Sequence, residues 1–358
     1  MAADLAALGW TIDIEAEFRR LAPADLVAGR VSLEHNHVYR VLTGQGEWLA
    51  EAAGRLKFRA GGRDELPAVG DWVGLRPPPA GGRALIRLIL PRRSSFSRKV
   101  AGRATSEQVI AANIDTVFLV STLQTAPNLR SLERYLVLAR QSGAAPVIVL
   151  NKSDLCGDLS SAIQDVTALS PLTPVHAVSA RDGRGFEWLE SYLGVGRTVA
   201  LLGPSGAGKS SIVNRLAGAE LLATGDLRAS GFGGRHTSVH RQLVVLDRGG
   251  VVIDTPGLRE LQLWDVDEGV ADTFADIVDL SIECRFRDCG HDQEPGCAVK
   301  AAVADGRLDA ARLGNFLKLT REREAFERRH DERAQMESKR QGKIGAKALR
   351  NLPDKKRR

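Results

Sequence analysis

Residues 203–210 read Gly-Pro-Ser-Gly-Ala-Gly-Lys-Ser, and an Asn-Lys-Ser-Asp tetrapeptide lies upstream of them at 151–154. The first stretch matches the phosphate-binding loop pattern GxxxxGK[ST]. The second matches the tetrapeptide with which GTPases read guanine, but there it follows the phosphate loop. A binding site depends on where residues meet in space, so both motifs can serve one site if the domain is circularly permuted.

The phosphate-loop match lies in the context that its chemistry requires. The apolar run Thr198–Leu202 predicts a buried strand before the loop, and residues 210–216 predict a helix after it. Glycines let backbone N–H groups curl around phosphate oxygens at a helix N-terminus, which favours anions. Lys209 is then expected to bridge the outer phosphates, and Ser210 to offer its hydroxyl to magnesium. The alternative is a Gly-rich turn with an incidental lysine.

The guanine motif also follows a predicted buried strand, residues 146–150. Asp154 can accept hydrogen bonds from the ring N–H and the amino group of guanine, which adenine does not offer in that arrangement. A buried carboxylate left unpaired would penalise the wrong base. Residues 178–180, Val-Ser-Ala, follow another short strand and fit the loop that supports the base through its backbone.

A further strand, residues 250–253, leads into Asp-Thr-Pro-Gly at 254–257. We expect Asp254 to hold magnesium through water and the N–H of Gly257 to sense the γ-phosphate. Leu258 stands where many GTPases keep a water-orienting glutamine, so hydrolysis must use another group. The Gly-rich stretch 229–238 offers His236 for water and Thr237 for magnesium, although a surface histidine is the open alternative.

Three of the four cysteines gather in the pattern Cys-x4-Cys-x-His-x5-Cys. Three thiolates and one imidazole match a closed tetrahedral zinc site, which predicts one structural zinc. The ligands are Cys284, Cys289, His291 and Cys297. The fourth cysteine, Cys156, is expected to be a small buried residue, and disulfides are not expected because the N-terminus shows no secretory pattern.

Length and charge bound the organisation of the chain. The 358 residues suggest two or three domains, and 43% hydrophobic content supports real cores. No apolar run reaches membrane-spanning length. The net charge of +6 resides in residues 321–358, which hold 14 Lys/Arg against 7 Asp/Glu. Such a tail suits phosphate backbones, and a solvated end is the alternative.

The patterns predict an N-terminal helical segment (1–23), then about five short strands typical of an OB-fold (24–92) and a basic linker (93–110). Strands alternate with helices over 111–265, which predicts a doubly wound α/β domain. Helices around the cysteines (266–340) and a basic tail (341–358) complete the order. The predicted fold is thus multidomain: a β-barrel, a circularly permuted α/β P-loop GTPase domain and a helical zinc-binding domain.

On these motifs, the chain resembles the ribosome small subunit-dependent GTPase A family (RsgA, also called YjeQ). The resemblance rests on the guanine motif, the phosphate loop, Gly-Arg-His-Thr at 234–237, residues 254–257 and the four zinc ligands, and it covers roughly residues 24–320. It implies cytoplasmic GTPase activity stimulated by the small ribosomal subunit late in its maturation, and His236 in place of the missing glutamine. The family often has three threonines after this histidine, whereas here Thr237 is followed by Ser238 and valine, so either hydroxyl can reach magnesium.

We therefore expect an rRNA-binding, monomeric GTPase that converts GTP to GDP and phosphate, with no membrane association. An RNA-binding protein that uses GTP only as a switch is the alternative, motivated by Leu258, and Asp154 opposes an ATP-using enzyme. His236 and Lys209 are the expected catalytic residues, and Ser210, Thr237 and Asp254 the magnesium ligands. The expected GTP-binding residues are Asn151, Lys152, Asp154, Ser179, Ala180, Gly203, Pro204, Ser205, Gly206, Ala207, Gly208, Lys209, Ser210, Ser211, Asp254 and Gly257.

Overall fold

A computed structural model describes residues 4–78, 82–100, 106–220, 242–254, 267–292, 294–322 and 324. Contacts divide the chain into two compact units, residues 1–262 and 263–358. The predicted barrel and the predicted α/β domain both fall in the first unit, and the cysteine cluster falls in the second. The domain boundaries within the first unit remain predictions.

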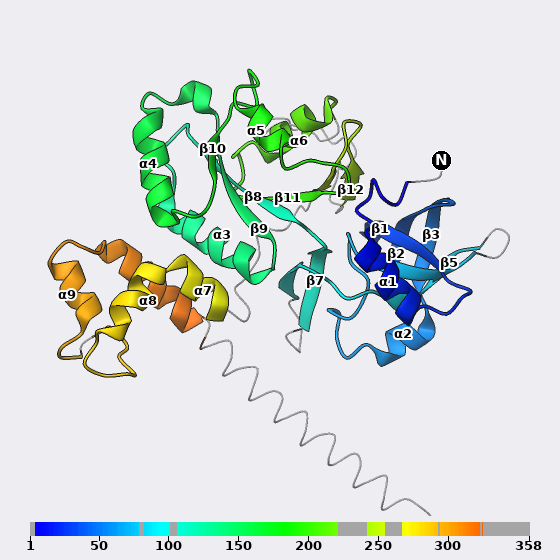
Figure 1. Ribbon diagram of the computed structural model, residues 1–358, viewed down its shortest axis with the longest axis horizontal. Coiled ribbons are helices and arrows are strands. Elements are labelled where there is room, and N and C mark those ends of the chain that lie inside the picture. The colour runs from blue at the N-terminus through cyan, green and yellow to red at the C-terminus, as the bar shows by residue number, and fades with distance from the viewer. Residues whose placement is uncertain are drawn as a thin grey trace, which may run out of the picture. The chain divides into compact units, whose positions relative to one another are not determined.

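The first unit begins with a short helix and a five-stranded barrel (Figure 1). Helix α1 (Ile12–Leu21) precedes β1 (Val27–His35), β2 (Val38–Thr43) and β3 (Gly46–Ala52); helix α2 (Gly54–Arg59) leads to β4 (Trp72–Arg76) and β5 (Ala84–Ile89). The strands pair in the order β1-β2-β3-β5-β4, and β4 closes onto β1. Only the β3–β5 pair is parallel, and this closed five-stranded Greek-key barrel is the expected OB-fold.

Alternation along the strands produces the barrel core. In β2 the side chains of Tyr39 and Val41 are buried, and Arg40 between them is exposed, as the two-residue period of a strand requires. The buried set also includes Val31, Ala50, Ala52, Val73, Leu75, Ala84 and Ile86. The interior is therefore packed with side chains rather than open to a ligand.

The predicted basic linker is not a plain loop. Strands β6 (Ser95–Val100) and β7 (Ser106–Ala112) form an antiparallel two-stranded sheet of their own. Arg92 fixes the start of this segment, since its guanidinium donates to both carboxylate oxygens of Asp71 at 2.8 Å and Asp71 is fully buried. Bidentate pairs of this kind hold geometry as well as charge.

The remaining strands build a parallel sheet with one antiparallel member. They are β8 (Thr116–Thr122), β9 (Ala145–Asn151), β10 (Val175–Ala177), β11 (Thr198–Leu202), β12 (Gln242–Val245) and β13 (Val251–Asp254). Their order is β10-β9-β8-β11-β13-β12, and only β12 runs antiparallel to its neighbour. Strand β11, which leads into the phosphate loop, lies at the centre with its five residues buried.

Helices cover both faces of this sheet (Figure 1). Helices α5 (Phe186–Glu190) and α6 (Lys209–Ala217) share a core with one face, which includes Phe118, Val149 and Val252. Helices α3 (Leu129–Gln141) and α4 (Leu159–Leu169) cover the other. Asn128 caps α3 by accepting a hydrogen bond from the Ser131 N–H. The predicted alternation of strands and helices and the doubly wound class are confirmed.

The barrel and the α/β sheet are joined edge to edge. Leu33 of β1 pairs with Gln242 of β12, so the two sheets form one continuous ladder of eleven strands. Beside this junction lies Arg30, which is 1% exposed. Its guanidinium donates to the Thr198 hydroxyl of β11 at 2.9 Å and to the Asn113 carbonyl at 2.9 Å. A barrel side chain thus contacts the first residue of the strand that enters the phosphate loop.

The second unit is helical in the part that the structure describes. Helices α7 (Asp267–Thr273) and α8 (Ala275–Ile282) precede the cysteines, and α9 (Ala298–Ala304) and a helix over 310–322 follow them. Phe274 is fully buried and contacts Phe316 edge to face. The helix predicted through about residue 340 and the basic tail lie outside the described residues. Among those described, no helix is both long enough and apolar enough to cross a membrane.

Candidate functional site

The guanine motif and the phosphate loop meet at one edge of the α/β sheet. Strands β8, β9, β10, β11 and β13 are mutually parallel, so their carboxyl ends lie together. Asn151 ends β9, Asp254 ends β13 and Gly203 follows β11. Ligands of open α/β sheets bind at this edge. The reversed motif order therefore leaves the motifs at the edge where a shared site requires them.

Asn151 ties three segments of the site together. Its side-chain Nδ2 donates to the Ala207 carbonyl of the phosphate loop at 2.9 Å. Its Oδ1 accepts a hydrogen bond from the Ala180 N–H at 3.1 Å. Asn151 is only 1% exposed, so these bonds are shielded from water. One amide group thus fixes the guanine motif against both the phosphate loop and the loop at 178–180.

The close approach of these segments explains a glycine of the phosphate loop. Gly208 has a φ of +90°, and a Cβ there would lie 2.2 Å from Nδ2 of Asn151. Any other residue would be strained and would displace the Asn151 amide. At the other end of the loop, a Cβ on Gly203 would lie 2.2 Å from the Val120 carbonyl of β8. At both positions a neighbouring atom leaves no room for a side chain, so the fold itself restricts them to glycine.

Asp154 is held in one orientation by a buried serine. The hydroxyl of Ser179 donates to Oδ1 of Asp154 at 2.8 Å, and Ser179 is fully buried. The Asp154 side chain is 14% exposed, and Oδ2 lies 4.0 Å from the Arg181 guanidinium. Ser179 lies in the predicted base loop, and its hydroxyl bond to Asp154 is a contact that no sequence pattern reports.

A cavity of about 300 Å³ adjoins the guanine motif. It is lined by Asn151, Lys152, Asp154, Leu155, Ala180, Arg181, Gly208 and Ser211. Lys152 adopts a left-handed backbone conformation with φ of +65°, and its Nζ donates to Gln124 at 3.0 Å. The cavity therefore brings the Asp154 carboxylate, an acceptor suited to a purine, next to the edge of the phosphate loop at Gly208.

The phosphate loop leads directly into helix α6. This helix begins at Lys209, so the first N–H groups of α6 face the loop. The Lys209 ammonium donates to the loop carbonyls of Gly203 and Pro204, at 2.8 and 2.7 Å. These bonds hold the Lys209 ammonium against its own loop. Ser210 and Asp254 are both half-buried at the same sheet edge.

Several predicted groups lie outside the described residues. These are the catalytic candidate His236, the hydroxyls of Thr237 and Ser238, the γ-phosphate sensor Gly257, and Leu258. Their roles stay predictions. The remaining predicted nucleotide-binding residues fall in the guanine motif, the base loop, the phosphate loop or at the end of β13.

One residue of the site region gave no signal in the sequence. Arg215 of α6 donates to the carbonyls of Ala180 and Arg181, each at 3.3 Å. Its guanidinium also lies 5.4 Å from the centre of the Phe186 ring. Arg215 thus links the helix that follows the phosphate loop to the loop that supports the base. No motif flags an arginine seven residues into such a helix, so only the geometry finds it.

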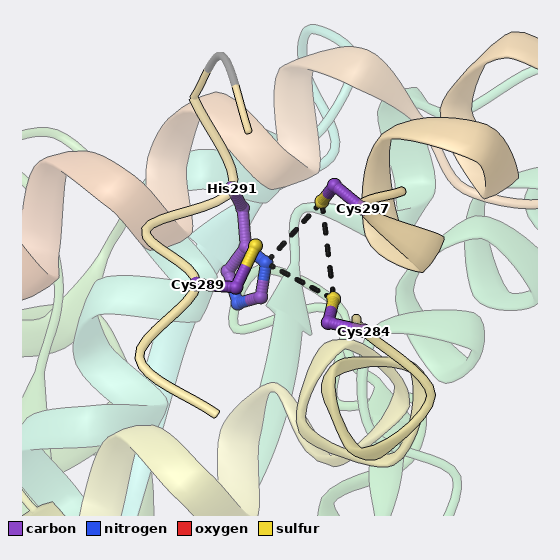
Figure 2. Close-up of side chains that lie close together, drawn as sticks. All are labelled: Cys284, Cys289, His291 and Cys297. Atoms are coloured by element: carbon purple, nitrogen blue, oxygen red, sulfur yellow. Dashed lines mark hydrogen bonds between the residues drawn. The ribbon is translucent and has the colours of Figure 1, made fainter. Parts of the chain in front are cut away.

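The second unit brings its four predicted ligands together, as Figure 2 shows. The thiol Sγ of Cys284 lies 3.9 Å from that of Cys297, and Nδ1 of His291 lies 3.7 and 3.5 Å from these two sulfurs. All four ligand atoms, including Sγ of Cys289, lie within 4.8 Å of one another. A tetrahedral zinc with Zn–S near 2.3 Å requires S···S separations of about 3.8 Å and S···N separations of about 3.5 Å. The donor set and its spacing fit one zinc ion.

The fold and the site geometry have close counterparts among known proteins. Residues 89–264 match the family model described as RsgA GTPase. A protein of Opitutus terrae named small ribosomal subunit biogenesis GTPase RsgA is 48% identical over 336 residues, which cover 91% of this chain and 92% of that protein. The chain belongs to the RsgA family. An RsgA protein of Syntrophotalea carbinolica is 43% identical, with 87% of each chain covered.

Solved structures of RsgA-like proteins agree with the observed architecture. The crystal structure of YjeQ from Thermotoga maritima matches with a TM-score of 0.60 at 29% identity, covering 82% of this chain and 97% of that one. The structure titled YloQ, a circularly permuted GTPase, matches with a TM-score of 0.57 at 26% identity, covering 86% and 96%. The permuted order inferred from the motifs is therefore the order of the RsgA relatives.

Proposed function

We propose that this chain hydrolyses GTP to GDP and phosphate and acts in the biogenesis of the small ribosomal subunit. The observation that carries the GTPase assignment is the bridge made by Asn151, which joins the guanine motif to the Ala207 carbonyl and the Ala180 N–H. This bridge lets two motifs in reversed order serve one nucleotide. The relatives' names, small ribosomal subunit biogenesis GTPase, support the biological role.

The site residues divide the work of binding and hydrolysis. Asp154, oriented by Ser179, accepts from the ring N–H and amino group of guanine, and Ala180 lines the same cavity while its N–H donates to Asn151. The backbone of residues 203–208 and the start of α6 cradle the phosphates. Water attacks the γ-phosphorus and the bond to the β-phosphate oxygen breaks, so the charge that develops on the leaving GDP must be neutralised near Lys209.

Two metal ions complete the proposal. Ser210 and Asp254, with Thr237 or Ser238, would hold magnesium, which supplies charge neutralisation at the phosphates. Cys284, Cys289, His291 and Cys297 would hold a structural zinc. His236 is proposed to place the attacking water. We also infer a cytoplasmic monomer that contacts rRNA, for which the relatives' ribosomal names and the basic tail are the support.

The decisive experiment measures phosphate release from GTP with and without purified small ribosomal subunits. We expect slow turnover by the protein alone and strong stimulation by the subunits. GTP binding with negligible turnover under both conditions would instead favour a GTP-dependent switch. The absence of GTP binding would refute the site.

A further inference from the structure

Helix α2 of the barrel presents an aromatic ring to solvent. Its six residues, Gly54–Arg59, include none that is buried. Leu56 packs on the barrel core. Phe58, two residues later, points the opposite way, because two helical residues are separated by about 200°. It is 90% exposed, compared with 56% for Trp188. Burying an exposed ring of this size on a partner is favourable, and nothing within the described part of the barrel covers it.

Cations surround this ring. Arg55, Lys57 and Arg59 are all exposed, and α2 has no acidic residue in its first turn. None of the three makes an ion pair with a carboxylate in the described part of the chain. Arg55 and Phe58 are three residues apart, so they share one face of the helix. We call these four residues, Arg55, Lys57, Phe58 and Arg59, the α2 patch.

The face that OB-folds commonly use for nucleic acid is poorly suited to it here. That face is formed by strands 2 and 3. On β2 and β3 the outward charged groups are Arg40, Glu47 and Glu51, and the arginine lies 3.8 Å from Glu47. Two carboxylates and one paired cation repel a phosphate backbone. Of these three elements, α2 rather than β2 or β3 therefore carries the unpaired positive charge in the described part of the chain.

We propose that the α2 patch is an RNA-binding surface, with Phe58 stacking on an unpaired base and the three cations contacting the phosphates on either side. The proposal deepens the proposed function, on which it rests, by naming one surface through which the barrel contacts rRNA. Aromatic stacking accepts any base, and flanking Lys or Arg follow the backbone, which is the chemistry of single-strand recognition.

Other anionic partners fit the patch less well. An interfacial membrane helix needs a broad apolar face, whereas α2 offers one outward apolar residue, Phe58. An acidic peptide would satisfy the cations but leaves the ring without a partner of defined geometry. The combination of one protruding ring and three unpaired cations on six residues matches one nucleotide and its neighbouring phosphates.

The test uses the full chain, two variants of the patch and a matched control for each. Phe58→Ala is compared with Leu172→Ala, which removes an apolar side chain that is 97% exposed. The double variant Arg55→Gln/Lys57→Gln is compared with the double variant Arg197→Gln/Arg248→Gln. The control has the same change in net charge, and its two side chains are also exposed. All six positions are exposed, so the fold should survive, and circular dichroism verifies this.

Binding is measured to a fluorescent single-stranded RNA of about 12 nucleotides and to the same RNA as a duplex, over a range of salt concentrations. Phe58→Ala should weaken single-strand binding about thirtyfold, the middle of the range for loss of one stacked base, without changing the salt slope. The double charge variant should lower the slope of log K against log salt by about 1.4, that is about 0.7 for each lost phosphate contact. The controls should bind as the unaltered protein does.

Three outcomes would overturn the proposal. One is equal affinity of the Phe58→Ala and Leu172→Ala variants for single-stranded RNA. The second is an unchanged salt slope in the Arg55/Lys57 variant. The third is a loss confined to vesicles of phosphatidylserine and phosphatidylcholine or to a poly-glutamate peptide, tested in parallel. Subunit-stimulated GTP turnover of the unaltered protein is measured separately, so failure of the proposed function is distinguishable from failure of the α2 patch.

Discussion

Replacement of Arg30 tests how the barrel is fastened to the nucleotide-binding sheet. The guanidinium donates to the carbonyls of Leu8, Gly70 and Asn113 and to the hydroxyl of Thr198, and it lies over the Trp72 ring. No carboxylate of the described residues forms an ion pair with it. Burial lowers the pKa of Arg30 to about 10, so the group stays charged at neutral pH. Keeping this charge buried costs about 3 kcal/mol, at 1.4 kcal/mol for each unit of pKa.

These free energies predict that Arg30→Lys destabilises the protein more than Arg30→Met does. Arg30→Met removes the charge and leaves at least the Leu8 and Asn113 carbonyls without this partner, a loss of about 2–6 kcal/mol that is partly offset by the 3 kcal/mol regained. The net destabilisation should lie between about −1 and 3 kcal/mol, with a centre near 1 kcal/mol. Arg30→Lys keeps the buried charge but cannot reach four acceptors from one ammonium group, so it should cost about 3–5 kcal/mol.

Urea denaturation followed by tryptophan fluorescence measures this order, because Trp10 and Trp72 lie in contact beside Arg30. Arg40→Met is the control: Arg40 is an exposed arginine of the same barrel, and its loss should change the free energy of unfolding by less than about 0.5 kcal/mol. If the lysine variant is more stable than the methionine variant, the positive charge stabilises the contact between barrel and sheet more than the several hydrogen bonds of the planar guanidinium do. That result would contradict the prediction.

The remaining predictions concern the nucleotide, the metal and pH. Asp154→Asn should lose GTP and gain xanthosine triphosphate, each by several kcal/mol in competition binding, because the new amide donates to an oxygen where guanine has a donor; retained GTP preference would contradict the base assignment. Lys209→Ala with Ser210→Ala should abolish phosphate release while the melting temperature is kept, and unchanged release would remove them from the site. Cys289→Ser should lower zinc content in metal analysis with little change in GTP affinity; unaltered protein without zinc would exclude the site. Burial lowers the pKa of His176 below its usual 6.5, so the unfolded chain takes up this proton first and stability should fall as pH drops below 6.5. His176→Gln should flatten that fall in acid titrations followed by circular dichroism, and an identical fall in the variant would contradict it.

Much of the fold follows from short-range patterns in the sequence. The run at 198–202 is strand β11 with the same bounds, and Asn128 caps helix α3 as its position implies. Both depend on local chemistry: a fully apolar strand in a parallel sheet and a side chain that accepts from the first turn. The cysteine cluster is equally predictable from the sequence, because its four ligands lie within fourteen residues.

Contacts between residues far apart in the sequence cannot be predicted from such local patterns. Arg30 looks like any polar residue of a half-exposed strand, and its partner Thr198 lies 168 positions away. The serines and charged residues around the start of β6 predict a linker over 93–110. In the structure, backbone hydrogen bonds pair β6 with β7, and the amino-acid composition does not indicate such bonds. The role of Arg215 cannot be predicted from the sequence for the same reason, because it contacts the base loop only through two backbone carbonyls.

The strand order also governs how the chain is made. Strand β8 pairs on one side with β9, which follows it closely, and on the other with β11, whose first residue is Thr198. During synthesis at 5–20 residues per second, the second edge of β8 waits about 4–15 s for its partner. An apolar strand with an open edge is a template for aggregation. The growing chain therefore carries an open, apolar strand edge until the strand that enters the phosphate loop has been made.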